Sequence, residues 1–374
     1  FKYYNFFTGN LNLALSASGS GFHLPLLSIL LPIGLSFHTF QAMSYTIEVY
    51  RGNQPAERHL GIYALYVMFY PQLVAGPIER PQNVLPQLKE FRAYNWDNVK
   101  EGLARMLWGF FKKVVIADRL AMVADRTFGH TPESSSVALL IGAVFYSFQI
   151  YCDFSGYSDI ALGAAKVMNI SLMENFKQPY LSKGIHEFWS RWHISLSSWF
   201  RDYVYIPLGG NRKGSLRRRI NVAVVFLLSG LWHGANWTFI VWGALHGLFV
   251  ILLVGNSNEL KEGRPAFVNT LRVIVNFTLV TFLWIFFRSE NLSNALSYIQ
   301  QIFSLKGGTH YIGISKVEFL FSLALIAIMM LREKYAAGHY IASNSRFYIY
   351  TAFMVLACYF FGVFIENQFI YFQF

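Results

Sequence analysis

The chain is poor in cysteine and in charged residues. Its 374 residues include only two cysteines, Cys152 and Cys358. Two are too few for a disulfide framework or a cysteine-ligated metal cluster, and we interpret both as small apolar packing residues. Charged residues make up 14% of the chain and hydrophobic residues 54%, whereas a soluble domain carries about 25% charged residues. This shortage of charge argues against a soluble globular domain and favours a protein that crosses a membrane several times.

Several common catalytic patterns are also missing. The sequence has no Gly-x-Ser-x-Gly nucleophile elbow, no Walker phosphate loop, no dinucleotide-binding glycine fingerprint and no His-Glu-x-x-His pair. Neither cysteine has the polar neighbourhood that activates a thiolate, so a cysteine nucleophile is not expected. His193, His233 and His246 are conceivable zinc ligands, but their spacing resembles no metal site, and we predict none.

Long apolar runs predict an all-α polytopic membrane protein. A membrane-spanning helix needs roughly 20 mostly apolar residues. The candidate spans are 24–49, 60–75, 137–152, 220–232, 237–254, 268–287, 317–331 and 347–365. The runs 60–75 and 220–232 are shorter than a full crossing. They predict re-entrant or broken helices, which persist where protein or water satisfies the backbone.

No internal repeat, low-complexity tract or long loop divides the chain, so we predict one membrane domain over residues 1–374. The chain begins at Phe1, and residues 1–7 resemble the end of an earlier hydrophobic element. No signal-peptide pattern is present there. We therefore expect the natural protein to continue upstream, with an N-terminal transmembrane portion that this chain lacks.

The net charge of +11 is concentrated in two stretches, 80–113 and 211–220. The second contains no acid, and its cations are Arg212, Lys213, Arg217, Arg218 and Arg219. By the positive-inside rule both stretches face the cytoplasm. We interpret most of this charge as a topology signal with contacts to anionic lipids. A smaller part could dock an acidic carrier protein or a phosphorylated donor, and no nucleic-acid partner is expected.

His233 is the most informative residue, because it lies in the stretch LWHGANW (231–237) within an otherwise apolar run. An imidazole in a membrane loses much of its hydration and needs a partner or a water-filled cavity. Ionisable groups inside a membrane are therefore functional candidates. The alternative is a packed structural histidine with one satisfied nitrogen, and the residue type alone leaves both open.

A second histidine lies in the aromatic stretch 188–203. On a continuous helix at about 100° per residue, one face gathers Trp189, Trp192, Leu196, Trp199, Phe200 and Tyr203. His193 falls within this face, whereas Arg191, Arg201 and Asp202 fall on or near the other. We predict an amphipathic helix that lies partly in the membrane with its aromatic face inward. His193 then points into the protein, as a functional group or as a buried structural residue.

Two carboxylates, Asp153 and Asp159, follow directly after an apolar run. Carboxylates at membrane depth are costly unless they are paired or hydrated. They could act as general bases, but we favour structural ion pairs with Arg191 or Arg201.

General-base chemistry by a histidine is the reaction that remains. A neutral imidazole can accept the proton of a hydroxyl as the oxygen attacks an activated carbonyl, which contributes about 10²–10⁴ in rate. Donor and acceptor held together in one narrow passage would react without a covalent enzyme intermediate, helped by their orientation.

At these residues the chain resembles the membrane-bound O-acyltransferase (MBOAT) family, and within it the bacterial branch typified by the membrane acetyltransferase of alginate O-acetylation. The matching stretches are 70–78 (YPQLVAGPI), 153–159 (DFSGYSD), 188–211, 228–239 and the ending 366–374. The resemblance implies a ring of tilted and re-entrant helices around a central tunnel. It also implies that His233 is the active-site base and that His193 is the second, branch-specific histidine.

The same resemblance sets our expectations for substrates and partners. An acyl thioester such as acetyl-CoA enters from the cytoplasm, with no tightly bound cofactor. The acceptor hydroxyl comes from the other side of a bacterial inner membrane. A separate extracytoplasmic acyltransferase partner passes the acyl group to a polysaccharide or cell-wall polymer. The side chains expected to contact substrate are Asp153, Trp189, Arg191, Trp192, Arg201, Asp202 and Asn236.

Three other functions stay open at this stage. One is transfer of D-alanine from a carrier protein to teichoic acid, the activity of a related branch of the family. Another is transport of lipid-linked polymers, although transporters often have two corresponding halves and the sequence has no such symmetry. The third is a non-catalytic scaffold in an export complex.

Overall fold

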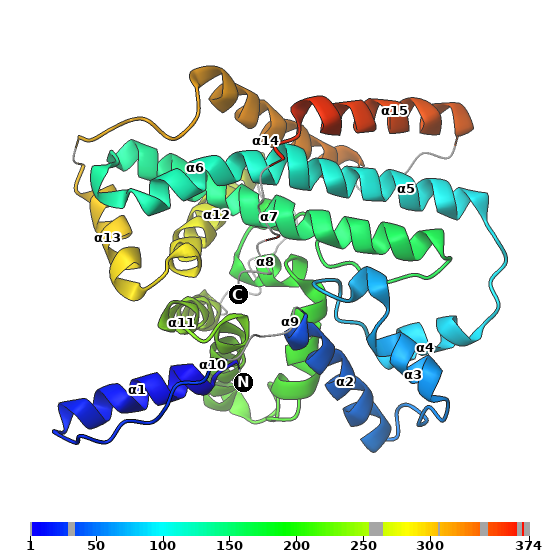
Figure 1. The fold of residues 1–374 in the computed structure, drawn as a ribbon, viewed down its shortest axis with the longest axis horizontal. Coiled ribbons are helices and arrows are strands. Elements are labelled where there is room, and N and C mark those ends of the chain that lie inside the picture. Colours follow the sequence, from blue (N-terminus) through cyan, green and yellow to red (C-terminus); the bar gives the residue numbers. More distant parts are fainter. Residues whose placement is uncertain are drawn as a thin grey trace.

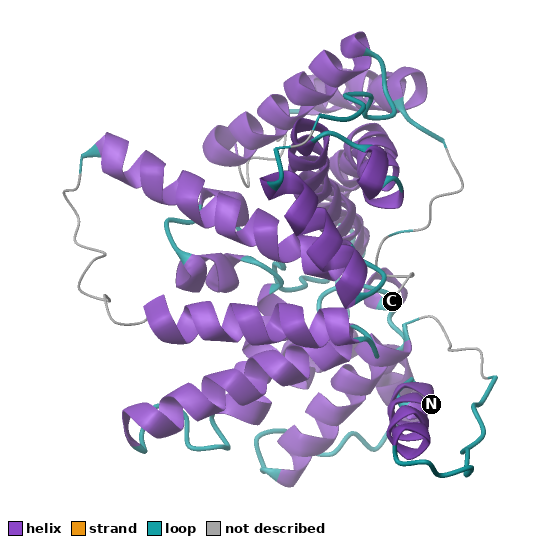
Figure 2. Ribbon diagram, turned by 90° about the vertical axis from the view of Figure 1, so that its left-hand side faces the viewer, coloured by secondary structure: helices purple, strands orange, loops and turns teal. Residues whose placement is uncertain are grey.

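The computed structural model describes residues 2–28, 34–253, 265–305, 307–336, 343–364 and 369. Within these ranges the regular elements are helices, and the one β interaction is an isolated bridge between Ser134 and Thr309 (Figure 2). The prediction of an all-α protein is confirmed. Most of the ending 366–374, which contributes to the family resemblance, lies outside the described residues.

The α-helices are α1 (Tyr4–Ala17), α2 (Leu35–Tyr50), α3 (Leu60–Val67), α4 (Pro81–Lys89), α5 (Trp96–Phe110), α6 (Asp118–Gly129), α7 (Ser136–Val167), α8 (Ile185–Arg191), α9 (Ile194–Phe200), α10 (Gly214–His233), α11 (Trp237–Leu252), α12 (Ala266–Arg288), α13 (Leu292–Phe303), α14 (Lys316–Ala336) and α15 (Asn344–Phe361). Short 3-10 helices are η1 (Tyr70–Gln72), η3 (Thr131–Glu133) and η4 (Pro179–Leu181), and π-helical turns are η2 (Phe111–Ala117) and η5 (Arg201–Tyr205).

Helix α7 forms the centre of the arrangement. Figure 1 shows α5 and α6 end to end along one side of α7, with α14 and α15 beyond them. The short helices α8 and α9 and the α10–α11 hairpin lie on the other side of α7. The helices cross at varied inclinations, not as a parallel bundle (Figure 2). The ring and the tunnel implied by the family resemblance stay predictions.

Paired glycines allow α5 and α7 to approach until their backbones touch. A Cβ built on Gly109 would lie 2.6 Å from the carbonyl oxygen of Gly156, and one on Gly163 would lie 2.5 Å from that of Gly102. Small residues permit this close packing of helices, as they do in membrane proteins generally. These two contacts hold α7 in register with α5 and so position the polar residues that α7 carries.

The predicted spans meet mixed outcomes. Among the described residues, two helices are long and apolar enough to cross a membrane, α7 and α12, which correspond to the predicted runs 137–152 and 268–287. The run 60–75 contains only the eight-residue α3 followed by η1, so its prediction as a short segment is confirmed.

Three predicted boundaries are wrong. Helix α7 continues to Val167, because the polar residues after Cys152 are buried against α5 and need not end the helix. The short run 220–232 belongs to the 20-residue helix α10, whose first turns carry the arginines that interrupt the apolar pattern. Within the run 24–49, helix α2 begins only at Leu35, and residues 24–28 are not helical.

Candidate active site

His233 is the last residue of α10 and lies at the tip of a tight helical hairpin. The chain turns at Gly234, and the Asn236 side chain accepts from the backbone N–H of Thr238 (3.1 Å) at the start of α11. A Cβ built on Gly230 would lie 2.3 Å from the carbonyl oxygen of Phe239, so the two helices touch at this tip. The hairpin buries His233 to 5% exposure, although the residue ends a helix.

The prediction of one continuous helix over 188–203 is wrong. Helix α8 ends at Arg191, and α9 begins at Ile194. Between them His193 adopts a left-handed backbone conformation with φ +44°, which is uncommon for a residue with a Cβ. The break turns the chain sharply at the histidine, and non-glycine residues in such conformations cluster at functional sites.

Asn175 is responsible for the break and was missed by the sequence analysis. Its carbonyl oxygen accepts from the Ile194 N–H (3.0 Å), and its side-chain oxygen accepts from the Ser195 N–H (3.2 Å). These are the first two amides of α9, and a new helix start needs acceptors for them. The Asn175 side chain also donates to Ser158 Oγ on α7 (3.4 Å), which ties the break to the central helix.

The two predicted histidines both contact one tryptophan. The ring of Trp232 is 4.9 Å from that of His233 and 6.2 Å from that of His193, measured between centroids. His193 is 1% exposed. The prediction that His193 points into the protein is confirmed, and His233 is buried as well.

The series of alternating rings continues to a third histidine. Trp242 lies 5.2 Å from the ring of His233 and 4.9 Å from that of His246. Trp189, a predicted substrate contact, donates its indole N–H to His246 Nδ1 (3.2 Å). Within the described part of the chain, no three side chains are grouped to hold a metal ion. The arrangement is therefore an aromatic core in which histidines and tryptophans alternate.

A polar cavity of about 660 Å³ lies beside this core. Its basic lining residues are Arg105, Lys112, Lys177, Arg191 and Arg332, and its acidic ones are Asp159, Glu174 and Glu333. Two rings lie between the cavity and the histidine of the break. Phe176 lines the cavity and contacts Phe154 (5.0 Å between centroids), which in turn contacts His193 (4.7 Å).

A second cavity of about 470 Å³ lies between α8, α9 and α10. Trp189 and Arg201 line it, together with Ser229, which is one helical turn before His233. Ser190 lines both cavities. Cavities therefore lie on both sides of the α8–α9 segment that carries His193.

The predicted ion pairs of Asp153 and Asp159 with Arg191 or Arg201 are wrong. Asp153 accepts from Lys113 Nζ (2.7 Å), and Asp159 pairs with Lys112 (2.6 Å) and with Arg105 (2.9 Å). All three cations come from α5 and η2, which pack along α7. Arg191 instead pairs with Glu187 one turn earlier on α8 (2.5 Å).

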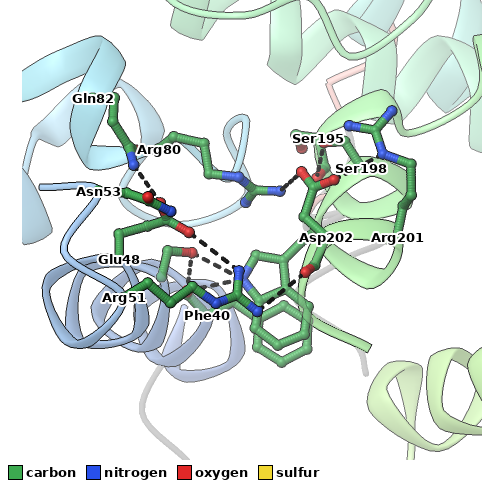
Figure 3. A network of polar contacts seen from close by, with 12 residues as sticks. Phe40, Glu48, Arg51, Asn53, Arg80, Gln82, Ser195, Ser198, Arg201 and Asp202 are labelled. Carbon is green, nitrogen blue, oxygen red and sulfur yellow. Dashed lines mark hydrogen bonds and ion pairs between the residues drawn. The ribbon is translucent and has the colours of Figure 1, made fainter. Parts of the chain in front are cut away.

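Asp202 joins three arginines at the surface (Figure 3). Its carboxylate pairs with Arg80 (3.2 Å) and with Arg201 (2.8 Å), and its backbone oxygen accepts from Arg51 (3.4 Å). The side chain of Arg201 is 63% exposed. This network fastens the start of η5 to the end of α2, and it involves neither histidine.

The remaining predicted substrate contacts have structural partners. Trp192 is 1% exposed and packs on Phe188, with ring centroids 5.5 Å apart. Asn236 also donates to the carbonyl of Glu290 (2.7 Å) and so links the hairpin tip to the end of α12. Of the seven predicted contacts, Trp189, Arg191 and Arg201 line a cavity, whereas Asp153, Trp192, Asp202 and Asn236 hold elements together.

Comparison with known proteins shows the family of this chain. Residues 58–289 match the profile described as "MBOAT, membrane-bound O-acyltransferase family". The protein named "Probable alginate O-acetylase AlgI" of Pseudomonas putida is 46% identical over 304 residues, which cover 81% of this chain and 61% of that relative. The "Peptidoglycan O-acetyltransferase" of Helicobacter pylori is 38% identical, covering 82% of this chain and 62% of the relative.

A more distant match is the "Teichoic acid D-alanyltransferase" of Streptococcus thermophilus, 32% identical over 60% of this chain and 57% of that relative. The chain belongs to the membrane-bound O-acyltransferase family. It spans about three fifths of the length of the P. putida and H. pylori relatives.

Proposed function

We propose that this chain is the catalytic part of a membrane O-acyltransferase. It transfers an acyl group, preferably acetyl, from a thioester to the hydroxyl of an extracytoplasmic acceptor. The observation that carries the proposal is the pair His193 and His233, which are both buried and both contact the indole of Trp232, with cavities on both sides of the α8–α9 segment that carries His193. A buried histidine can act as a general base only on a substrate that reaches it through the protein. An acyltransferase whose substrates enter through cavities would meet this condition.

His233 is the base in this proposal. Its ring lies at the tip of the hairpin among the rings of Trp232, Trp242 and Phe287, each about 5 Å away between centroids. Packing of this kind holds the imidazole in one orientation and keeps bulk water from it. His193, fixed by the break between α8 and α9, orients the acceptor or relays the proton.

The polar cavity is the entrance for the thioester donor. It has more basic than acidic lining residues, and two of its cations, Lys177 and Arg332, form no ion pair among the described residues. Such cations can bind the phosphates of a coenzyme A or phosphopantetheine donor. We expect this cavity to face the cytoplasm of a bacterial inner membrane, because the positive-inside rule favours that side for the basic residues of 80–113.

An extracytoplasmic partner protein receives the acyl group for a polysaccharide or cell-wall polymer. The names of the alginate and peptidoglycan relatives favour acetyl transfer, because those relatives are more similar to this chain than the D-alanyl relative is. In a D-alanyl transferase the carrier protein would replace acetyl-CoA at the same cavity.

The proposal predicts that the full-length protein with His233→Ala loses acyl transfer by about 10²-fold or more, since a general base contributes about 10²–10⁴. The measurement is release of free thiol from acetyl-CoA by the purified protein in lipid nanodiscs, in the presence of an oligosaccharide acceptor whose hydroxyl takes up the acyl group, with thermal unfolding to confirm the fold. His130→Ala is the matched control, because His130 is exposed at the end of α6, and it should retain wild-type turnover.

Wild-type turnover in the His233→Ala protein would refute the assignment of the base. If the wild-type protein turns over D-alanyl carrier but not acetyl-CoA, the acyl group is D-alanine. If it releases no thiol from either donor, the transporter or scaffold interpretation replaces the enzymatic one.

A further inference from the structure

Lys2 lies at the helix end that carries His233. The Lys2 ammonium donates to the backbone oxygen of Trp232 (2.9 Å) and to that of His233 (3.2 Å). It also contacts Ser36 Oγ (3.4 Å) at the start of α2. One side chain, far away in the sequence, therefore binds the last two carbonyls of α10.

These carbonyls need a partner. The last four C=O groups of a helix receive no hydrogen bond from an N–H group of the same helix. In α10 the oxygen of Gly230 accepts from the N–H of Gly234, just after the helix. The C-terminal end of a helix also carries a partial negative charge, which a cation stabilises. The ammonium of Lys2 is such a cation, placed at the last two carbonyls of α10.

The same ammonium fixes the surroundings of Trp232. Ser36 is followed on α2 by Phe37 and Phe40, whose rings lie 5.4 and 5.3 Å from the ring of Trp232. Lys2 thus holds together the start of α2 and the end of α10, the two elements that surround the indole contacted by both histidines. A shift of this helix end would move the His233 ring directly.

We propose that Lys2 is a positioning residue for the active site, which holds the α10 terminus and thereby the imidazole of His233 in its reactive place. This inference rests on the proposed function of His233 as the base. Lys2 itself acts through the backbone of α10.

An experiment can distinguish a purely structural role of Lys2 from a positioning role, because other hydrogen bonds also hold α1 in place. The Asn12 side chain accepts from the Leu24 N–H (2.9 Å), and Asn10 accepts from the Trp237 indole (3.0 Å). Asn10→Ala therefore weakens the docking of α1 without removing a contact to the carbonyls of α10. It is the matched control for a change at Lys2.

The experiment compares Lys2→Met, Lys2→Arg and Asn10→Ala in the full-length protein. Kinetics with acetyl-CoA should show that Lys2→Met lowers kcat about tenfold, as a small misplacement of a reacting group does, with KM changed by less than about twofold. Lys2→Arg keeps the charge and should restore at least about half of kcat. Asn10→Ala should keep kcat while its melting temperature falls.

A second readout does not depend on turnover. Modification of His233 by diethylpyrocarbonate, followed by mass spectrometry, should be about tenfold faster in Lys2→Met, because a charged hydrogen bond that holds its backbone is gone. Lys2→Met with unchanged kcat and modification rate overturns the inference, and so does an equal loss of kcat in Asn10→Ala. If the wild-type protein releases no thiol, the proposed function fails, and the modification rates alone decide the role of Lys2.

Discussion

Two residues outside the predicted site determine how its histidines are held. Asn175 creates the backbone break at His193 by accepting from the first amides of α9. Lys2 holds the end of α10 at His233. Both act on the backbone, so their effect is on the direction in which each imidazole points. At this scale the geometry of the site depends on the main-chain conformation as much as on which side chains are present.

Asn175→Ala should destabilise the protein and lower its activity. It removes the side-chain acceptor of the Ser195 N–H and the donor to Ser158 in a residue that is 1% exposed. Leaving a buried donor unsatisfied costs about 1–3 kcal/mol. Thermal unfolding in detergent would measure the loss.

Asn175→Asp is the matched comparison for this prediction. It keeps an oxygen that accepts from the Ser195 N–H, but it replaces the donor to Ser158 with an acidic oxygen whose burial costs stability. It should therefore keep more of the activity than Asn175→Ala, even where its melting temperature falls. Equal effects of the two substitutions would contradict the role of the α9 amide.

At the scale of elements, glycine contacts decide how α5 and α7 pack. The pairs Gly109–Gly156 and Gly102–Gly163 bring the two backbones together, and α7 then presents Asp153 and Asp159 to the lysines and arginine of α5 and η2. The polar cavity depends on this packing, because Arg105, Lys112 and Asp159 line it.

Gly109→Ala should therefore destabilise the protein. The added Cβ would lie 2.6 Å from the Gly156 oxygen, and overpacking of a tight contact costs about 1–3 kcal/mol. The control is Gly9→Ala in α1, where a Cβ meets no atom within 4 Å. That change should stabilise α1 by up to about 1 kcal/mol, because alanine favours a helix more than glycine does.

Thermal unfolding of both variants tests this pair. The interpretation of α5–α7 packing is refuted if Gly109→Ala melts at the wild-type temperature. It is also refuted if both alanine variants change stability in the same direction by similar amounts, since then helix propensity alone would explain them.

At the scale of the whole molecule, the basic stretch 211–220 sets the expected orientation. It precedes and begins α10, a helix of 20 residues that is about 30 Å long at 1.5 Å per residue. Positive charge at one end of a helix favours the cytoplasmic side. The start of α10 should face the cytoplasm, and the hairpin tip with His233 should lie deeper in the membrane.

Cysteine labelling tests this orientation. Ser215→Cys, in a Cys358→Ser background, should react with a membrane-impermeant maleimide in inside-out vesicles and stay unlabelled in intact spheroplasts. Cys152 is buried and should not react in either preparation. Labelling of residue 215 in intact spheroplasts would reverse the orientation and move the proposed donor entrance to the other side.

The amino-acid sequence by itself determined the helical class, the family and the burial of His193 and His233. These follow from composition and from local patterns, because an apolar segment that contains a single imidazole is more stable inside the protein than exposed to water. The family resemblance is carried by contiguous motifs and needs no coordinates.

Only the tertiary structure decided how these residues are held. Helical periodicity over 188–203 depends only on the residues within that stretch. It therefore cannot show that Asn175, which is 18 residues before His193, accepts hydrogen bonds from the first amides of α9. Sequence reasoning gave Asp153 the wrong cationic partner, because Lys113 reaches it only through the packing of η2 on α7. The contact of Lys2 with the end of α10 joins residues about 230 positions apart. Contacts of this range arise when helices pack, and no local pattern encodes them.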